Sequence, residues 1–344
     1  MAFTIMLTSA GGEMIPFLIT QLKASPNHAP RVLAIDAGDG NISRYLADGF
    51  WTIPHGKDPG YADAVLAILR QTKVDLLVPC SDEEALSLSA RREDVADAGC
   101  TLACVDHATL DVFSDKTRCY EVLAEKGIPV PLWRKVENLQ ALVSAVGEVM
   151  ALAGACVVKP ATGRGGRDVF VIGNTEGTAS LPDEYNGRET HLSEMAFKEL
   201  CAGQTEFAFP LIAMERLSEP VFDIDMLAWQ GEPVHVVPRR RANSQLPNEG
   251  HIFVDAPELQ ELGTNLVRAF SLSWLYDCDI MYDQAGHPRI LEINPRPSGS
   301  AAVTVAAGVP LFENMIALAK GDTTSAAPPV AGHTVLPYKT LLRV

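Results

Sequence analysis

Acidic and amide side chains recur at strand spacing in the segment 276–300, which reads YDCDIMYDQAGHPRILEINPRPSGS. Its central letters QAGH have turn chemistry and both flanks have strand composition, so the segment predicts a β-hairpin. If the hairpin closes symmetrically, Asp279 lies directly opposite Glu292. The same register places Asp277 opposite Asn294, and the two-residue period of a strand puts Glu292 and Asn294 on one face.

Two carboxylates that face each other repel, and a cation between them removes that cost. Mg²⁺ takes carboxylate and amide oxygens as ligands, so the facing of Asp279 and Glu292 predicts a divalent cation at this hairpin. An exposed acidic hairpin is the alternative. Ile290 and Ile293 argue against it, because they make the second strand too apolar for solvent on both sides. A strand register can slip by one residue, so the pairing stays open at this point.

A glycine-rich segment offers a second kind of chemistry. Lys159 ends an apolar strand and is followed by PATGRGGR, which contains Gly163, Gly165 and Gly166. Glycines let backbone N–H groups approach phosphate oxygens closely, and a strand-end lysine adds a positive charge. A Walker A loop has its lysine after the glycines and before a helix, so this segment is not one. Taken alone, it also fits an ordinary tight turn between two strands.

Two further segments could contact a nucleotide or a substrate. Met214–Leu217 lies at a strand whose free edge could read a purine ring, and Asp223 follows where an acid could accept ribose hydroxyl groups. Arg239, Arg240 and Arg241 form a basic triplet in an acidic chain. A guanidinium fork can bind a phosphate or a carboxylate through two hydrogen bonds. An ordinary surface strand and a solvated basic run are the alternatives.

These side chains need elements that hold them, and the first 108 residues predict a parallel sheet. Apolar runs with strand composition alternate there with helical patterns, which is typical of strands joined by crossover helices. The expected strands are Phe3–Thr8, Arg31–Ile35, Asp75–Pro79 and Thr101–Val105. The expected helices are Glu13–Lys23, Ala62–Gln71 and Glu83–Asp97. Together they predict a small doubly wound domain.

The rest of the chain predicts an α+β arrangement. A helix is expected over Asp111–Lys126, with Ser114 as its N-cap and Gly127 as its stop signal. Strands dominate afterwards, interrupted by an amphipathic helix over Leu259–Phe270. The expected strands are Cys156–Lys159, Asp168–Ile172, Ala208–Glu215, Val221–Trp229, Pro233–Pro238, Asp277–Asp283 and Arg289–Ile293. The predicted fold class is therefore α/β followed by α+β.

Composition limits the partners and the compartment. The 344 residues are 47% hydrophobic and 21% charged, which provides a large core and excludes disordered, collagen-like and coiled-coil chains. The net charge of −15 disfavours binding to nucleic acid or to an anionic membrane surface. The most apolar run, Val149–Val158, is about half of the ~20 residues that a membrane span needs. Seven cysteines without a CxxC pair fit buried thiols in a reducing cytoplasm.

Taken together and in this order, these segments resemble the ATP-grasp superfamily, particularly its carboxylate–amine ligases and the ATP-grasp domains of carbamoyl-phosphate synthetase and biotin carboxylase. The resemblance covers nearly the whole chain, and its most specific part is E-x-N-P-R with an acid one hairpin earlier. It implies a Rossmann-like pre-ATP-grasp domain over 1–108. A small ATP-grasp lobe would then span 109–190, and a large lobe with the metal site would span 191–344.

The resemblance also implies which residues bind ATP. Lys116 and Lys159 match the lysines near the nucleotide phosphates, and the glycine-rich segment matches the loop that closes over ATP. Met214–Leu217 overlaps the hinge that reads adenine. The ATP-binding residues implied in this way are Lys116, Lys159, Gly163, Gly165, Gly166, Glu215, Arg216, Leu217 and Asp223.

For the metal and the substrate, the resemblance implies a second set. Asp279, Glu292 and Asn294 match the metal ligands, although Asp279 stands where glutamate or glutamine is usual and therefore has a shorter reach. Arg296, in the letters NPR, matches an arginine that holds the acyl phosphate or the substrate carboxylate. The catalytic arginines implied are Arg296, Arg241 and Arg239.

The activity implied by the resemblance is a ligation that requires ATP and Mg²⁺ or Mn²⁺. A small carboxylate is activated as an acyl phosphate, an amine attacks it, and ADP and phosphate are released. Homodimers are common among the enzymes that the chain resembles. Three alternatives stay open: an enzyme that activates bicarbonate or carbamate, a nucleotide-binding regulatory module without turnover, and a Rossmann oxidoreductase. The last is disfavoured because the first turn, SAGG, lacks the GxGxxG spacing.

Overall fold

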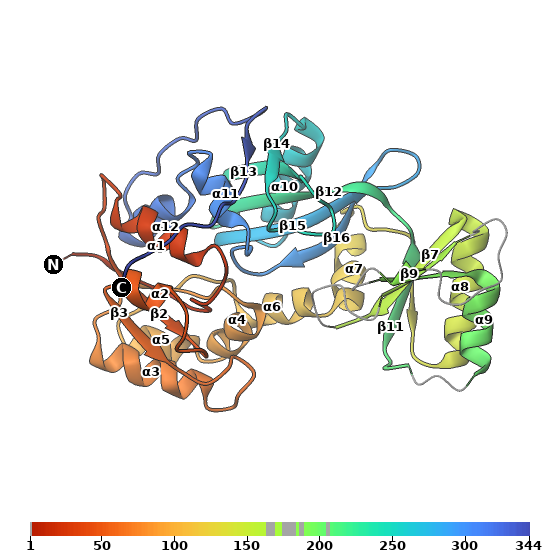
Figure 1. Ribbon diagram of the computed structural model, residues 1–344, viewed down its shortest axis with the longest axis horizontal. Helices are drawn as coiled ribbons and strands as arrows, with labels where there is room; N and C mark the ends of the chain where they lie inside the picture. The colour runs from red at the N-terminus through yellow and green to blue at the C-terminus, as the bar shows by residue number, and fades with distance from the viewer. Residues whose placement is uncertain (1, 163–168, 174–183, 186–188, 204–206) are drawn as a thin grey trace. The chain divides into compact units, whose positions relative to one another are not determined.

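The computed structural model describes residues 2–162, 169–173, 184–185, 189–203 and 207–344 (Figure 1). The chain divides into two compact units. Unit 1 comprises Met1–Asp111, Pro220–Ile280 and Glu292–Val344. Unit 2 comprises Val112–Glu219 and Met281–Leu291. The chain therefore passes between the units more than once, and the division into three consecutive domains stays a prediction.

The first sheet of unit 1 is parallel, with strand order β3-β2-β1-β4-β5. Its strands are β1 (Thr4–Leu7), β2 (Arg31–Asp36), β3 (Gly49–Thr52), β4 (Leu76–Val78) and β5 (Thr101–Leu102). The strand order reverses at β1, and right-handed crossovers then place helices on both faces. The helices are α1 (Ile15–Lys23), α2 (Ser43–Leu46), α3 (Tyr61–Gln71), α4 (Asp82–Ser89) and α5 (Arg92–Asp97). The predicted doubly wound domain is confirmed, and β3 is an additional strand.

The turn after β1 does not leave its backbone amides open to a dinucleotide. Gly11 N donates to Asp36 Oδ2 at 2.7 Å, and Gly38 N donates to Asp36 Oδ1 at 2.8 Å. The carboxylate at the end of β2 thus occupies the Gly11 amide that a dinucleotide phosphate would need. This contact, together with the missing glycine spacing, argues against the Rossmann oxidoreductase.

Two helix boundaries differ from the prediction. The helix expected over Glu83–Asp97 is divided into α4 and α5. Ser114, expected to begin a helix, instead ends α6 (His107–Ser114), and α7 (Lys116–Glu125) begins after Asp115. The Asp115 side chain accepts hydrogen bonds from the backbone of Thr117 and Arg118. Ser114 as N-cap was therefore wrong, because the neighbouring carboxylate satisfies two free N–H groups at this helix start.

The sheet of unit 2 has strand order β6-β11-β7-β8-β10-β9. Its strands are β6 (Trp133–Val136), β7 (Ala155–Pro160), β8 (Val169–Gly173), β9 (Glu184–Tyr185), β10 (Glu189–Ser193) and β11 (Leu211–Glu215). Helices α8 (Leu139–Ala153) and α9 (Glu194–Ala202) pack their apolar side chains against this sheet. The expected antiparallel pairing of β7 with β8 is confirmed, with Val157 opposite Val171. Helix α8 was not predicted, because the apolar run Val149–Val158 continues through its end at Gly154 into β7.

The third sheet has strand order β16-β15-β12-β13-β14-β17. Its strands are β12 (Ser218–Trp229), β13 (Glu232–Arg241), β14 (His251–Phe253), β15 (Trp274–Tyr282), β16 (Pro288–Asn294) and β17 (Thr334–Val335). Three helices accompany it in sequence, namely α10 (Pro257–Ala269), α11 (Ala301–Ala306) and α12 (Leu311–Lys320). The predicted hairpin is thus β15 and β16, and the basic triplet ends β13. Because β12 lies between β13 and β15, acidic and basic side chains far apart in sequence share one sheet.

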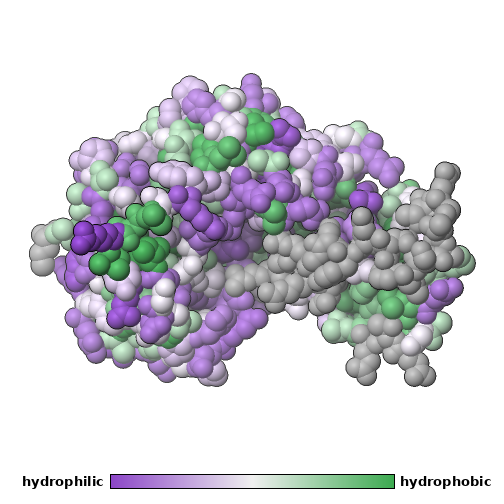
Figure 2. Space-filling model, viewed as in Figure 1, coloured by the Kyte–Doolittle hydropathy of each residue, from purple (hydrophilic) through white to green (hydrophobic). Residues whose placement is uncertain are grey.

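Hydrophilic side chains cover most of the coloured face in Figure 2, and hydrophobic side chains gather there in small patches. Several large apolar side chains are exposed in the C-terminal segment, including Leu336, Tyr338 and Leu341. Most other large apolar side chains of the described residues are buried in the strands and helices named above. Among the described helices, none combines the length and apolar composition that a membrane crossing requires.

The packing of α10 on the third sheet depends on Gly263. A Cβ atom at this position would lie 2.7 Å from Val236 Cγ1 and 3.2 Å from Ile224 Cγ2. We expect Gly263→Ala to destabilise the protein by about 1–3 kcal/mol, because two β-branched side chains on strands cannot move aside freely. The shift of the urea unfolding midpoint measures this effect. Gly147→Ala is the control: nothing lies within 4 Å of its Cβ position in α8, so alanine should stabilise by up to about 1 kcal/mol. A stabilised Gly263→Ala protein would contradict the close packing.

Candidate functional site

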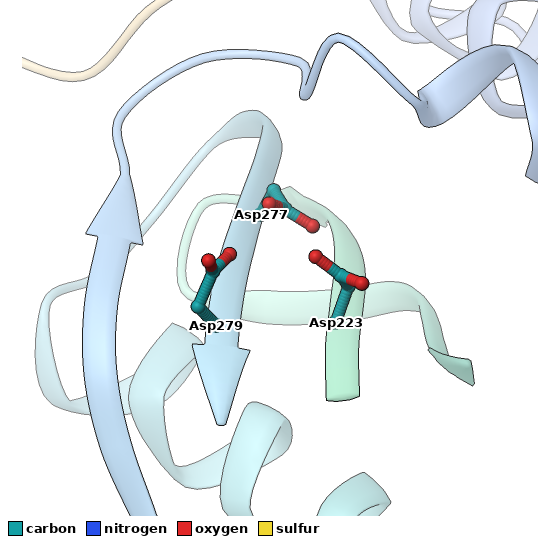
Figure 3. A group of neighbouring side chains, drawn as sticks. All are labelled: Asp223, Asp277 and Asp279. Carbon is teal, nitrogen blue, oxygen red and sulfur yellow. The ribbon is translucent and has the colours of Figure 1, made fainter. Parts of the chain in front are cut away.

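Three aspartate side chains of unit 1 converge on one face of the third sheet (Figure 3). Asp223 comes from β12, and Asp277 and Asp279 come from neighbouring β15. The two-residue strand period places Asp277 and Asp279 on the same face. One carboxylate oxygen from each of the three residues lies within 4.8 Å of the others. These three residues are called the acidic cluster below.

Asn294 joins the acidic cluster to Arg296. Its Nδ2 donates to Asp277 Oδ2 at 3.0 Å and to Asp279 Oδ1 at 3.4 Å, and its Oδ1 accepts from Arg296 Nη2 at 3.1 Å. The contact with Asp277 agrees with the facing of Asp277 and Asn294 that the hairpin predicts. Glu292 lies close enough for its charge to raise the pKa of Asp279. The structure therefore brings Asp279, Glu292 and Asn294 together, and their role as metal ligands stays a prediction.

Arg239 is enclosed beneath the acidic cluster. Its side chain has no exposed surface. Its Nε donates to Asp225 Oδ2 at 2.9 Å, while its Nη2 donates to Asp277 Oδ1 at 3.3 Å and to Ser298 Oγ at 3.0 Å. Complete enclosure favours a role in holding Asp225 and Asp277 in place. Direct contact of Arg239 with a substrate would require these bonds to break.

Arg241 lies at the rim of the same network, with 12% of its side chain exposed. Its Nη2 donates to Asp279 Oδ2 at 2.6 Å and to Asp223 Oδ1 at 2.7 Å, and its Nε donates to Asp223 Oδ2 at 3.0 Å. The Nε2 atom of His251 lies 3.1 Å from Asp223 Oδ2. Asp223, expected to accept ribose hydroxyl groups, is therefore grouped with the predicted metal ligands and has both oxygens bonded.

The pKa values of these carboxyl groups differ in direction. Burial raises the pKa of Asp277 well above its usual range and that of Asp279 to about 6, and the charge of Asp223 adds to both shifts. Burial acts the same way on Asp223, but the charges of Arg239 and Arg241 outweigh it and hold the pKa of Asp223 well below its usual range. The two arginines thus favour the ionised form of Asp223, whereas burial disfavours the ionised forms of Asp277 and Asp279.

Arg296 is fixed from the other side by the parallel-sheet part of unit 1. Its Nε lies 2.9 Å from Asp82 Oδ1, and its Nη1 donates to the carbonyl of Pro297 at 3.2 Å. Asp82 is the first residue of α4, directly after Ser81, whose side chain caps that helix. This helix start follows β4, next to β1 where the strand order reverses, and ligands of doubly wound sheets bind at such points.

The predicted phosphate-binding residues belong to unit 2. Lys116 begins α7 and Lys159 lies in β7, and both are buried. The backbone N of Lys116 donates to the carbonyl of Ala161 at 3.0 Å, so the start of α7 lies against the chain that leads into the glycine-rich segment. Gly163, Gly165 and Gly166 lie outside the described residues.

The predicted adenine-reading segment ends β11. Glu215 N donates to Leu132 O at 2.9 Å, and Glu215 Oε1 accepts from Leu132 N at 2.8 Å. Arg216 N donates to Ala155 O at 3.4 Å, and Leu217 is buried. The Glu215 side chain thus holds this segment against the chain before β6. Contact between the segment and a nucleotide stays a prediction.

Sequence reasoning assigned no role in the site to three participants, although it placed Asp225 on the strand of Asp223, Asp82 in a strand-to-helix turn and His251 among the satisfied polar residues. Asp82 stands in a strand-to-helix turn, VPCSDEE, whose place after a strand was a usable signal. Asp225 follows Asp223 at the strand period, which was also visible. His251 carried no local signal, because its partner Asp223 is 28 residues away and they meet only through strand order.

Two family models match the sequence. Residues 208–341 match the family described as "ATP-grasp in the biosynthetic pathway with Ter operon", and residues 5–103 match "PylC-like, N-terminal domain". The first match assigns residues 208–341 to the ATP-grasp superfamily. No curated protein matches the sequence.

Solved ATP-grasp structures share the fold at low sequence identity. N5-carboxyaminoimidazole synthetase from Staphylococcus aureus, complexed with ADP, superposes with a TM-score of 0.67 at 16% identity, covering 98% of this chain and 81% of that one. Biotin carboxylase from Campylobacter jejuni gives a TM-score of 0.68 at 16% identity, covering 94% and 72%. L-amino acid ligase from Bacillus licheniformis gives 0.60 at 16% identity, covering 93% and 74%. The predicted two-lobed ATP-grasp fold behind a parallel-sheet domain is confirmed.

The ATP-grasp fold implies a divalent cation, and the residues present fit one. The acidic cluster offers three carboxylates, and hard cations such as Mg²⁺ prefer oxygen ligands of this kind. Burial and the charges of neighbouring carboxylates raise the pKa values of Asp277 and Asp279, and a divalent cation bound at the cluster would offset both effects. These residues, with Glu292 beside them, would hold the ion.

Metal stabilisation should therefore depend on pH. Since the folded-state pKa of Asp279 is raised to about 6, the stability contributed by its protonated form is present at pH 4 and is lost as the pH rises through 6. Below pH 6 a cation must displace that proton. We expect Mn²⁺ to raise the melting temperature more at pH 7.5 than at pH 5.0, as differential scanning fluorimetry can measure.

The matched variants separate the site from general charge effects. Asp279→Asn should remove most of the metal-induced shift and its pH dependence. Asp255→Asn makes the same change at an exposed aspartate of unit 1 and should leave both unchanged. An equal metal-induced shift at both pH values in the unaltered protein would contradict the assignment.

Proposed function

We propose that this protein is an ATP- and Mg²⁺-dependent ligase that activates a small carboxylate as an acyl phosphate and couples it to an amine. The observation that carries the proposal is the acidic cluster, bonded through Asn294 to Arg296. The Asn294 amide connects two groups: the carboxylates that could bind a divalent cation, and a guanidinium group that could bind an anionic intermediate. A phosphoryl-transfer site needs both of these features.

The proposed reaction has two steps. A carboxylate oxygen of the substrate attacks the γ-phosphorus of ATP, the bond to the β,γ-bridging oxygen breaks, and ADP leaves. The amine then attacks the carbonyl carbon of the acyl phosphate, the C–O bond to phosphate breaks, and the amine loses a proton. The products are an amide, ADP and phosphate.

The chain's own residues act by charge and position. Lys116 and Lys159 would neutralise the nucleotide phosphates, and the glycine-rich segment would cover them. Arg296, with Arg241, would hold the substrate carboxylate and then the acyl phosphate through guanidinium hydrogen bonds. Mg²⁺, when bound, supplies charge neutralisation at the phosphate oxygens. This division of labour needs no histidine base.

The names of the structural relatives support an ATP-dependent reaction. They leave two candidates for the group that is activated, an organic carboxylate and bicarbonate. N5-carboxyaminoimidazole synthetase and biotin carboxylase were solved with ADP and with β-γ-ATP, respectively, and L-amino acid ligase is named for joining amino acids. Activation of bicarbonate therefore remains the second candidate.

A phosphate-release screen tests the proposal. The protein is incubated with ATP, Mg²⁺ and pairs drawn from amino acids, small carboxylates and small amines, with and without bicarbonate. A signal that requires two organic substrates supports the ligase, and mass spectrometry of the product identifies the new bond. A signal that requires bicarbonate selects the second candidate. ATP binding without phosphate release under every condition would contradict the ligase and favour a regulatory module that binds ATP without turnover.

Glu292 provides a sharp variant for the same assay. We expect Glu292→Gln to lower the phosphate-release rate about a hundredfold or more, because neutralising a metal-ligand carboxylate weakens the stabilisation of the transferring phosphoryl group. Glu261→Gln, at an exposed position of α10, makes the same charge change and should retain the normal rate. A Glu292→Gln protein with an unaltered rate would refute the predicted metal role of Glu292.

Asp82 should matter through Arg296. Removing the carboxylate that lies 2.9 Å from Arg296 Nε lets the guanidinium move, so Asp82→Asn should raise the KM for the carboxylate substrate more than the KM for ATP. We expect a KM increase of about tenfold, with partial rescue by Asp82→Glu. Equal changes in both KM values would indicate a general structural effect instead.

A further inference from the structure

Arg241 occupies a place that a divalent cation would need. Its Nη2 lies 2.6 Å from Asp279 Oδ2 and 2.7 Å from Asp223 Oδ1, between two of the three carboxylates of the acidic cluster. Its Nε lies 3.0 Å from the other oxygen of Asp223. A cation bonded to both carboxylates would meet this guanidinium group at contact distance. Two positive charges in a site of low exposure repel strongly, so the guanidinium and the cation exclude each other there.

The two arginines of this network differ in how firmly they are held. Arg239 has no exposed surface and bonds to Asp225 of β12, to Asp277 of β15 and to Ser298 in the loop after β16. Arg241 is the last residue of β13 and is partly exposed, and within the described part of the chain its side-chain hydrogen bonds go to the acidic cluster alone. Its side chain can therefore leave the cluster without breaking bonds to other parts of the fold, whereas Arg239 cannot.

We propose that Arg241 is an exchangeable internal cation. Without metal it neutralises Asp223 and Asp279; a divalent cation that binds the acidic cluster displaces its guanidinium from Asp279. The displaced group then has free N–H donors in the fork that suits phosphate or carboxylate. This second step rests on the proposed function, because it assumes that the released guanidinium faces an anionic substrate group.

The exchange orders the proposed reaction. Before metal binds, the guanidinium group of Arg241 is hydrogen-bonded to two carboxylates of its own chain, so it is a poor anion receptor. After metal binds, the same carboxylates are neutralised by the ion, and the arginine becomes available. Metal loading thereby prepares the anion-binding side chain, and an anionic substrate binds after the metal rather than before it.

The experiment measures Mn²⁺ affinity of the full-length protein without nucleotide, by electron paramagnetic resonance of free Mn²⁺. Arg241→Met removes the competing cation, and we expect Mn²⁺ to bind about tenfold more tightly than to the unaltered protein. Arg240→Met is the matched control. It removes the same charge from the adjacent residue of β13, whose side chain points to the opposite face of the sheet. We expect its affinity to change by less than about twofold.

The outcome that overturns the proposal is equally direct. An Arg241→Met protein that binds Mn²⁺ no more tightly than Arg240→Met would show that the guanidinium does not compete for the site. If Arg241→Met fails to fold without metal, Arg241→Lys replaces it. A lysine keeps the charge but cannot span Asp223 and Asp279 as a fork, so Mn²⁺ should still bind more tightly than to the unaltered protein. Unchanged affinity in Arg241→Lys would then reject the exchange.

Inorganic phosphate tests the second step. In calorimetric titrations we expect phosphate to bind the Mn²⁺-loaded protein at least about fivefold more weakly after Arg241→Met than after Arg240→Met. Equal phosphate binding by the two variants would reject the anion role of Arg241. Neither measurement requires turnover, so a protein that shows the exchange but releases no phosphate from ATP in any screen refutes the proposed function alone.

Discussion

Buried carboxylates on one sheet face are the constraint on which the site depends. Taking several charged groups out of water is costly unless opposite charges and hydrogen bonds compensate. Asp225 and Asp277 are compensated by Arg239, and Asp223 and Asp279 by Arg241. Because β12 lies between β13 and β15, each arginine reaches across the central strand to a carboxylate of the next one. The strand order is therefore what allows this network to be buried.

The two arginines offset the cost of burying these carboxylates only in part. The carboxylates that remain costly to ionise are the ones that can bind a cation. The raised pKa values of Asp277 and Asp279 show that these groups hold their negative charge at a cost in folded stability. A more stable chain would replace one acid by a neutral residue, yet it would lose oxygen ligands for a cation. Stability given up at a cluster of polar groups is typical of a functional site. The ion pair of Asp82 with Arg296 extends the same network to the parallel-sheet part of unit 1.

The parts of this arrangement that follow from local pattern could be predicted from the sequence. The hairpin and the facing of Asp277 with Asn294 depend only on turn chemistry and the strand period, and the structure agrees with both. The grouping of Asp223 with Asp279 could not be predicted, because it depends on the adjacency of β12 and β15, about fifty residues apart in sequence. The enclosure of Arg239 could not be predicted for the same reason, because a basic triplet gives no sign that its first member is fully enclosed. The prediction of a helix start can be wrong by a single residue, as when Asp115 rather than Ser114 caps α7.

An aspartate at position 279 fits this network better than the glutamate usual in the family. A shorter side chain keeps its carboxylate close to β15, where Asn294 from the neighbouring strand and Arg241 from β13 both reach it. A glutamate would carry the carboxylate one methylene farther from the sheet and away from Asp223. The shorter side chain therefore leaves an oxygen of Asp279 within 4.8 Å of oxygens of Asp223 and Asp277, neither of which belongs to the E-x-N pattern. The aspartate at this position and Arg241 at the end of β13 are thus two parts of one electrostatic arrangement.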